Sequence, residues 1–191
     1  MRKFYKTQYE FYSSYCLGKT IYERNGFDEY PETAYSIFIS AIETLPEKSL
    51  TIIDIGCGNA SLLKYIISYT KKKIIPFGVD FLSASIKEAQ SYILPLFSNN
   101  FLCVNAIDYI WKRSFDIVLF DPSILAKDDI NTFFQRIKLS KSHYCIVYVY
   151  SDAIRMLKIA NIVEILPSFV SDKNILYVTQ TEQISLVLFH L

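Results

Sequence analysis

The stretch from Thr51 to Ser61, TIIDIGCGNAS, restricts the possible folds of this chain more than any other part of its sequence. It opens with β-branched residues, passes through a turn with two glycines, and leads into residues 62–69, whose apolar side chains repeat with helical spacing. This order predicts a strand, a tight turn and a helix. Glycine lets a ligand approach the backbone closely, and the first turn of a helix presents free N–H groups. We therefore expect this stretch to bind a nucleoside, a phosphate or a similar polar group.

The composition is that of a globular protein. The chain has 191 residues, of which 51% are hydrophobic and 20% are charged, so it can bury a substantial core. We expect one domain over residues 1–191. The net charge of +1 gives no electrostatic reason to expect a nucleic-acid backbone as partner, although neutrality does not exclude one.

The cysteines and histidines do not have the spacing of a metal site or of a disulfide framework. Cys16, Cys57, Cys103 and Cys145 lie far apart, and the chain has two histidines. We therefore predict that the protein holds no metal and works in a reducing, cytoplasmic environment. The N-terminus lacks the apolar run of a signal peptide, and no stretch approaches the roughly 18 apolar residues of a spanning helix. We expect no membrane partner.

Residues 1–30 form a segment rich in aromatic side chains and interrupted by Gly18 and Gly26. We interpret it as a flap that packs its rings onto the core or as a lid over the ligand. The core is expected to begin at residue 31 with an amphipathic helix that ends near Pro46.

Beyond this helix, apolar strands alternate with helices. The expected strands cover residues 51–55, 74–79, 101–104, 115–120 and 144–150. Strands that are nearly continuous in hydrophobic residues and alternate with helices indicate a parallel sheet covered on both faces. Two later strands, residues 174–179 and 183–189, are joined by a short turn and predict an antiparallel hairpin. The expected fold class is α/β.

Polar residues follow the first four of these strands, at Asp54–Asn59, Asp80–Phe81, Asn105–Ala106 and Asp121–Pro122. Ligands of open α/β sheets bind outside the carboxyl ends of the strands. This constellation resembles the class I S-adenosyl-L-methionine-dependent methyltransferases, from about Pro31 to the C-terminus. The resemblance implies a Rossmann-like three-layer sandwich over residues 31–191, with a mostly parallel seven-stranded sheet that ends in the hairpin. It also implies S-adenosyl-L-methionine as cofactor and S-adenosyl-L-homocysteine as product.

The glycine turn is similar to the acidic-x-Gly-x-Gly-x-Gly turn of this family. It begins at Asp54, and Ala60 takes the last glycine position, where we expect alanine to cost little at a helix start. The resemblance implies that the turn holds the amino-acid end of the cofactor. The carboxylate, or the solvent it orders, suits the ammonium group, and backbone N–H groups suit the cofactor carboxylate. The implied contacts in this turn are Asp54, Gly56, Cys57, Gly58 and Asn59.

The nucleoside end of the cofactor is assigned to the next two strand ends. Asp80 can accept hydrogen bonds from both ribose hydroxyls, although a turn or helix cap is the alternative role. Phe81 could lie against the adenine ring. Asn105–Ala106 resembles the Asp-Ala of the family, and asparagine keeps the acceptor for the adenine amino group.

A nicotinamide dinucleotide is the rival cofactor, because Gly56 and Gly58 followed by Asp80 also match part of its fingerprint. The third glycine of that fingerprint would fall at Ser61, where it is absent. This difference favours the methyl donor.

On the acceptor side, Asp121 is the candidate catalytic residue and also borders the cofactor. The run Asp121-Pro122-Ser123-Ile124 partly resembles the Asp/Asn-Pro-Pro-aromatic motif of nucleobase amine methyltransferases, but Ser123 and Ile124 replace the second proline and the stacking aromatic. Asp121 could instead hold its loop. A general base is needed only when the acceptor arrives protonated.

The sequence thus favours a methyltransferase for a small-molecule or peptide acceptor, since it shows no separate substrate domain and no basic face. One alternative is an RNA or DNA nucleobase N-methyltransferase. The other is a cofactor-binding partner subunit without activity, which uses its aromatic flap as an interface. The oligomeric state stays open. The residues expected to line the acceptor side are Tyr12, Tyr15, Tyr30 and Tyr150.

Overall fold

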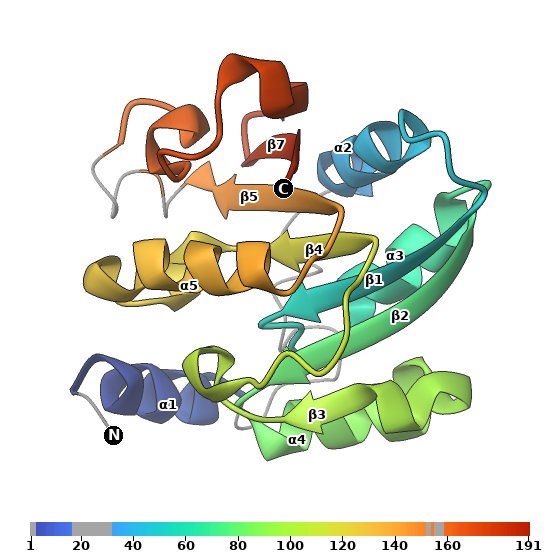
Figure 1. Cartoon of the computed structure of the whole chain (residues 1–191). Helices are drawn as coiled ribbons and strands as arrows, with labels where there is room; N and C mark the ends of the chain where they lie inside the picture. Colours follow the sequence, from blue (N-terminus) through green and yellow to red (C-terminus); the bar gives the residue numbers. More distant parts are fainter. Residues whose placement is uncertain (1–2, 17–31, 152–153, 155–158) are drawn as a thin grey trace.

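A computed structural model of the chain describes residues 3–16, 32–151, 154 and 159–191. Its centre is a seven-stranded sheet with the strand order β3-β2-β1-β4-β5-β7-β6 (Figure 1). The strands are β1 (Ser49–Ile55), β2 (Lys73–Asp80), β3 (Phe101–Cys103), β4 (Ile117–Phe120), β5 (Tyr144–Tyr150), β6 (Ile175–Gln180) and β7 (Ile184–His190).

The sheet is parallel from β3 to β5 and antiparallel at β7 and β6. This arrangement confirms the predicted α/β fold class with its C-terminal hairpin. The strand order reverses at β1, which lies between β2 and β4. Since ligands of such sheets bind where the order reverses, the carboxyl end of β1 is the place to look for a site.

Helices cover both faces of the sheet, as expected for mainly parallel strands. They are α1 (Lys3–Cys16), α2 (Glu32–Glu43), α3 (Ser61–Tyr69), α4 (Ser83–Glu88) and α5 (Lys127–Leu139). Strand side chains alternate between two buried clusters. Ile52 and Ile146 pack with α2 and α3 on one face, while Ile53 and Val147 pack with α5 on the other. The result is three layers with a core on each side of the sheet.

The structure adds detail at three places. Residues 3–16 of the aromatic N-terminal segment form one helix, α1, which ends ahead of Gly18. The place of Asp129, just before the apolar run that starts at Ile130, predicts a helix cap. Helix α5 already begins at Lys127, however, and the Asp129 carboxylate accepts a hydrogen bond from Tyr5 Oη at 2.5 Å. Residues 162–165, which the sequence left unassigned, form a short 3₁₀ helix.

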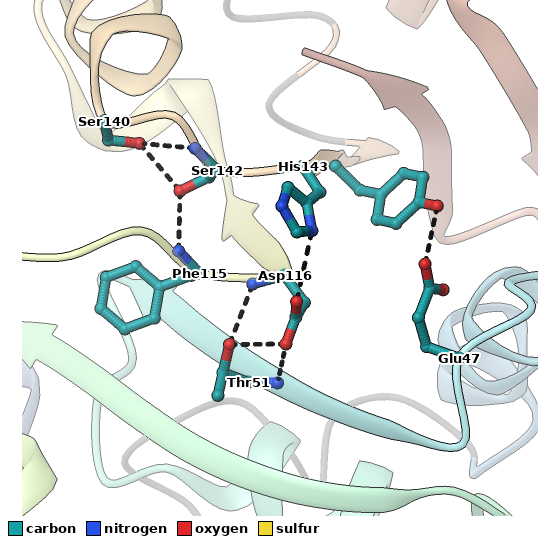
Figure 2. Close-up of polar contacts among 8 residues, drawn as sticks. Glu47, Thr51, Phe115, Asp116, Ser140, Ser142 and His143 are labelled. Atoms are coloured by element: carbon teal, nitrogen blue, oxygen red, sulfur yellow. Dashed lines mark hydrogen bonds and ion pairs between the residues drawn. The ribbon is translucent and has the colours of Figure 1, made fainter.

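The amino ends of β1, β4 and β5 are tied together through Asp116 (Figure 2). Its Oδ2 accepts from the backbone N of Thr51 at 2.7 Å and from Thr51 Oγ1 at 2.8 Å, and its Oδ1 lies 3.3 Å from His143 Nδ1. These contacts fix the strands at the end of the sheet opposite the glycine turn. Among the described residues, no helix is both long and apolar enough to cross a membrane.

Candidate functional site

The glycine turn after β1 is folded back against the end of β2. Gly56 and Gly58 have φ angles of +86° and +53°, in the left-handed region that glycine enters easily. The N–H groups of Gly56 and Cys57 donate to the carbonyl of Val79 at 2.8 and 3.0 Å. The backbone of the turn is therefore held in place where β1 and β2 both end.

Asp80 joins the two strand ends. Its Oδ2 accepts from the N–H of Gly58 at 3.0 Å, and its Oδ1 accepts from the N–H of Leu82 at 2.8 Å. Burial raises the pKa of Asp80, against the lowering effect of the backbone hydrogen bonds from Leu82, Gly58 and Phe81. The turn-holding role considered for Asp80 is thus present. Each carboxylate oxygen has a second lone pair, which remains suitable for a ribose hydroxyl.

Asp54 and Asp121 are buried beside this turn. Asp54 is 1% exposed, and its Oδ1 has no hydrogen-bond partner among the described residues. Burial, together with the charges of Asp80 and Asp121, raises the pKa of Asp54 from 3.8 to about 8. Burial also raises the pKa of Asp121 to about 6, although the N–H of Ser123 donates to it at 2.8 Å. Three carboxyl groups that share one buried region are the kind of arrangement that active and binding sites show.

Two residues of the turn have side chains that point into the protein. Asn59 is fully buried, and its Oδ1 accepts from the N–H and the hydroxyl of Ser61 at 3.1 and 2.6 Å. Cys57 is also buried, and its sulfur would lie 2.6 Å from a Cβ placed on Gly78. What Asn59 and Cys57 offer a ligand is therefore their backbone.

The residues assigned to adenine lie at the neighbouring strand ends. Phe81 is half-buried, and its ring centroid lies 6.0 Å from that of Tyr9 and 6.1 Å from that of Tyr12. Asn105 is half-buried and its Oδ1 accepts from the N–H of Ile107 at 3.1 Å, while Ala106 is buried. The Asn105 carbonyl therefore already serves as the cap of a short 3₁₀ turn.

Helix α1 lies on the side of the molecule to which the arrowheads of β1, β4 and β5 point (Figure 1). Tyr5, which is 2% exposed, fastens it there through Asp129. Gln8 Nε2 donates to the carbonyl of Ser123 at 3.5 Å, next to Asp121. Residues 3–16 of the aromatic N-terminal segment therefore contact residues that follow β2 and β4.

The structure describes only some of the residues that were expected to line the acceptor side. Tyr12 contacts Phe81 as stated. Tyr150 is half-buried at the end of β5, with its ring 5.9 Å from that of Tyr148. Tyr30, and the side chain of Tyr15, lie outside the described residues.

Sequence reasoning did not assign Gln8 and Tyr9 to the candidate site. Both lie in the aromatic N-terminal segment, and the helical spacing from Tyr5 to Tyr12 is the signal that could have identified them. Tyr148, which the sequence places toward the same end of β5 as Tyr150, is buried, and this burial, with the charges of Asp54 and Asp121, raises its pKa well above the ordinary value of 10. The alternation of tyrosine with valine along β5 could have identified its face.

No protein-family model matches the sequence, and no curated protein matches it. Solved structures do match. Over 100% of this chain and 98% of the other, the chain resembles magnesium protoporphyrin IX methyltransferase (ChlM) from Synechocystis PCC 6803, with a TM-score of 0.65 and 12% identity. The chain has the class I methyltransferase fold.

Two further solved structures show the same class I fold. A putative rRNA-methylase from Clostridium thermocellum matches with a TM-score of 0.57 and 14% identity, over 83% of this chain and 97% of the other. The plantazolicin methyltransferase BpumL matches with a TM-score of 0.56 and 18% identity, over 80% of this chain and 61% of the other. ChlM was solved with S-adenosylmethionine bound, and BpumL with S-adenosylhomocysteine and a desmethyl plantazolicin analogue.

Among the described residues, no group of three or more His, Cys, Asp or Glu side chains could hold a metal ion. The groups that the described residues present at these strand ends are carboxyl groups, backbone N–H groups and aromatic rings.

Proposed function

We propose that this chain is an S-adenosylmethionine-dependent methyltransferase that acts on a small-molecule or peptide acceptor. The observation that carries the proposal is the unpartnered, buried oxygen of Asp54 beside the glycine turn, in a region shared with Asp80 and Asp121. A buried carboxyl oxygen without a partner is costly unless a ligand supplies a donor. The ammonium group of S-adenosylmethionine is such a donor, and two of the structural neighbours carry this cofactor or its product.

The proposed cofactor contacts follow the strand ends in order. Asp54 would take the ammonium group, and the backbone of Gly56 and Gly58 would take the carboxylate. Asp80 would accept from the ribose hydroxyls through the lone pairs left free by its backbone bonds. Phe81 and Asn105 would border the adenine.

Bound S-adenosylmethionine supplies a methyl group activated by a positively charged sulfur. What the chain contributes is alignment of the acceptor and exclusion of water, which can account for much of the acceleration. Asp121 is buried with a pKa of about 6, so at neutral pH it is largely ionised and can take a proton from an acceptor that arrives protonated.

The acceptor side is proposed to lie between helix α1 and the loop after β4. Tyr12 and Gln8 come from the helix, and Ser123 comes from the loop. An aromatic, uncharged wall of this kind favours a compact or apolar acceptor over a strongly charged one. Ile124 packs against Gly56 and supplies no stacking ring, which is why nucleobase methylation is the less favoured alternative.

Calorimetry with S-adenosylhomocysteine tests the cofactor site. We expect saturable binding of this ligand and none of NAD. Asp80→Ala should weaken binding by about 1.5–3 kcal/mol, the range for losing a charged hydrogen-bond partner. Asp80→Asn keeps one acceptor oxygen, for either the Gly58 or the Leu82 N–H group. Thermal unfolding of both Asp80 variants without ligand therefore measures how far each damages the turn. Asp172→Ala, at an exposed side chain just before β6, is the control. Unchanged affinity in both Asp80 variants would reject the ribose role.

Transfer of labelled methyl groups tests the acceptor class. Label taken up by small molecules or peptides supports the proposal, and label found only in RNA or DNA favours the nucleobase alternative. A chain that binds S-adenosylhomocysteine, forms a stable complex with a second protein and labels nothing on its own would instead be a partner subunit. Inactivity of Asp121→Asn with retained cofactor binding would place Asp121 on the acceptor side.

A further inference from the structure

A pocket of about 430 Å³ lies at the end of the sheet opposite the proposed methyl-transfer site. One wall is the segment 111–114, which precedes β4, and the other is the segment 136–141, where α5 ends and the chain turns toward β5. Figure 2 shows the adjoining contacts, in which Ser140 and Ser142 are linked to the backbone of Phe115. Asp54 and Asp80 lie at the carboxyl ends of β1 and β2, and Asp121 follows the carboxyl end of β4.

Four cationic side chains line this pocket, and no acidic residue does: Lys112, Arg113, Arg136 and Lys141. Within the described part of the chain, none of the four forms an ion pair. The net charge of the whole chain is only +1 and does not reveal this concentration of positive charge. Residues far apart in the sequence are brought together by the packing of α5 against the start of β4.

The two guanidinium groups are held in place. Arg113 lies over the rings of Phe77 and Phe115, with its Cζ 4.7 and 5.4 Å from their centroids. Arg136 donates to the carbonyls of Ile107 and Tyr109. Cation–π stacking and carbonyl hydrogen bonds fix the positions of these groups without cancelling their charge.

The helix dipole accounts for the positions of only two of these four cationic residues. Arg136 and Lys141 lie at the C-terminal end of α5, where cations are favoured. Lys112 and Arg113 come from a different segment, and their approach adds repulsion between like charges. An anionic ligand would remove this repulsion, and the hydroxyl of Ser114 at the pocket would add a neutral donor.

We propose that this pocket binds a phosphate group, held by the fixed guanidinium groups of Arg113 and Arg136 and by the ammonium groups of Lys112 and Lys141. Planar guanidinium groups match the geometry of phosphate oxygens, and lysine adds charge. The phosphate could belong to a phosphorylated small molecule or to a nucleic-acid strand, which share this chemistry. The proposal is independent of methyl transfer, since it uses none of the residues at the glycine turn.

Tryptophan fluorescence provides a direct test, because Trp111 lines the pocket and is the single tryptophan of the chain. The full chain is titrated with inorganic phosphate, with a nucleoside monophosphate and with a short single-stranded RNA. We expect a saturable change that weakens as salt is added. Binding of the monophosphate alone assigns the site to a small molecule, and much tighter binding of the RNA assigns it to a nucleic-acid strand.

Charge-removing variants decide whether the pocket is responsible. Lys112→Gln with Lys141→Gln should weaken binding by about tenfold, as expected for losing charged contacts. These two side chains are exposed, so the fold should survive. Lys71→Gln, an exposed lysine after α3 on the other face of the sheet, is the matched control. No saturable change in fluorescence or calorimetry with any of the three probes, or affinity unchanged in the double variant, overturns the proposal. Binding of S-adenosylhomocysteine, measured in parallel, should be the same in all variants.

Discussion

The pKa of Asp54 makes the stability of the protein depend on pH. Its value is about 8 in the folded protein because of burial and the nearby charges of Asp80 and Asp121, against an ordinary value of 3.8. Between these two values the folded state holds a proton that the unfolded state has lost. The free energy of unfolding therefore falls as pH rises through this window. The contribution of Asp54 to stability is largest at pH values below the window.

We predict that Asp54→Asn flattens this dependence, because the amide cannot ionise. Urea unfolding of the ligand-free protein at several pH values measures it, and the variant should be the more stable of the two near pH 8 by a few kcal/mol. Asp108→Asn, at an exposed side chain, should keep the slope of the unchanged protein. An equal slope in Asp54→Asn would show that Asp54 is not the group responsible.

Gly56 is the residue of the turn that tolerates a side chain least. Its φ is +86°, and an added Cβ would lie 2.9 Å from Ile124 Cδ1. We predict that Gly56→Ala lowers the free energy of unfolding by about 1–2 kcal/mol through the left-handed backbone alone, with the contact adding to this. Adding Ile124→Ala should recover only the contact part in thermal unfolding. A fully stable Gly56→Ala would contradict the geometry of the turn.

At the scale of single residues, the sequence predicted the residue types at the strand ends but not their contacts. That Asp54, Asp80 and Asp121 would share a buried region followed from parallel strands ending at one edge. Ala60 was expected to sit at little cost at a helix start, whereas its φ is +68°, so it occupies a left-handed position that suits glycine. Backbone angles at such a turn depend on how it packs against β2, which no local pattern encodes.

Tyr5 is a buried residue of helix α1, and its hydroxyl contacts helix α5 and the residue before it. Tyr5 Oη donates to Asp129 Oδ2 at 2.5 Å and accepts from the N–H of Ala126 at 3.3 Å. We predict that Tyr5→Phe weakens the docking of α1 by about 1.5–3 kcal/mol, because the Asp129 carboxylate loses a hydrogen-bond donor. Amide hydrogen exchange in residues 3–16 should become faster, while the exposed Tyr9→Phe serves as control. Exchange that stays unchanged in Tyr5→Phe would show that α1 is held mainly by other contacts.

At the scale of helices and strands, the sequence predicted best those elements that have a strong apolar pattern. The bounds of β5 were predicted to the residue, because seven consecutive apolar residues lie between polar turns. The helical character of α1 was missed because its many aromatic rings fit a flap as well as a helix. The assignment of Asp129 as a cap was wrong for a related reason. Its carboxylate is used by Tyr5, 124 positions earlier in the chain, and local sequence gives no sign of this partner.

At the scale of the whole molecule, one sheet contributes side chains to both hydrophobic cores. Phe38 belongs to the core between the sheet and α2, and Phe133 belongs to the core between the sheet and α5. Neighbouring residues of β4 and β5 enter alternate cores, so neither core can be lost without disturbing the same strands. The strand order and the gathering of cations at the amino ends arise only at this scale, which is why the sequence indicated neither.

The single domain expected over residues 1–191 stays a prediction, and unfolding of two core variants tests it. Phe38→Ala and Phe133→Ala each empty a fully or almost fully buried site, so each should lower the free energy of unfolding by about 3–5 kcal/mol. If the cores unfold together, both variants should keep one transition, shifted to lower temperature by similar amounts and seen alike by far-ultraviolet circular dichroism and Trp111 fluorescence. Two separate transitions in either variant, with only one of them shifted, would divide the chain into independent units.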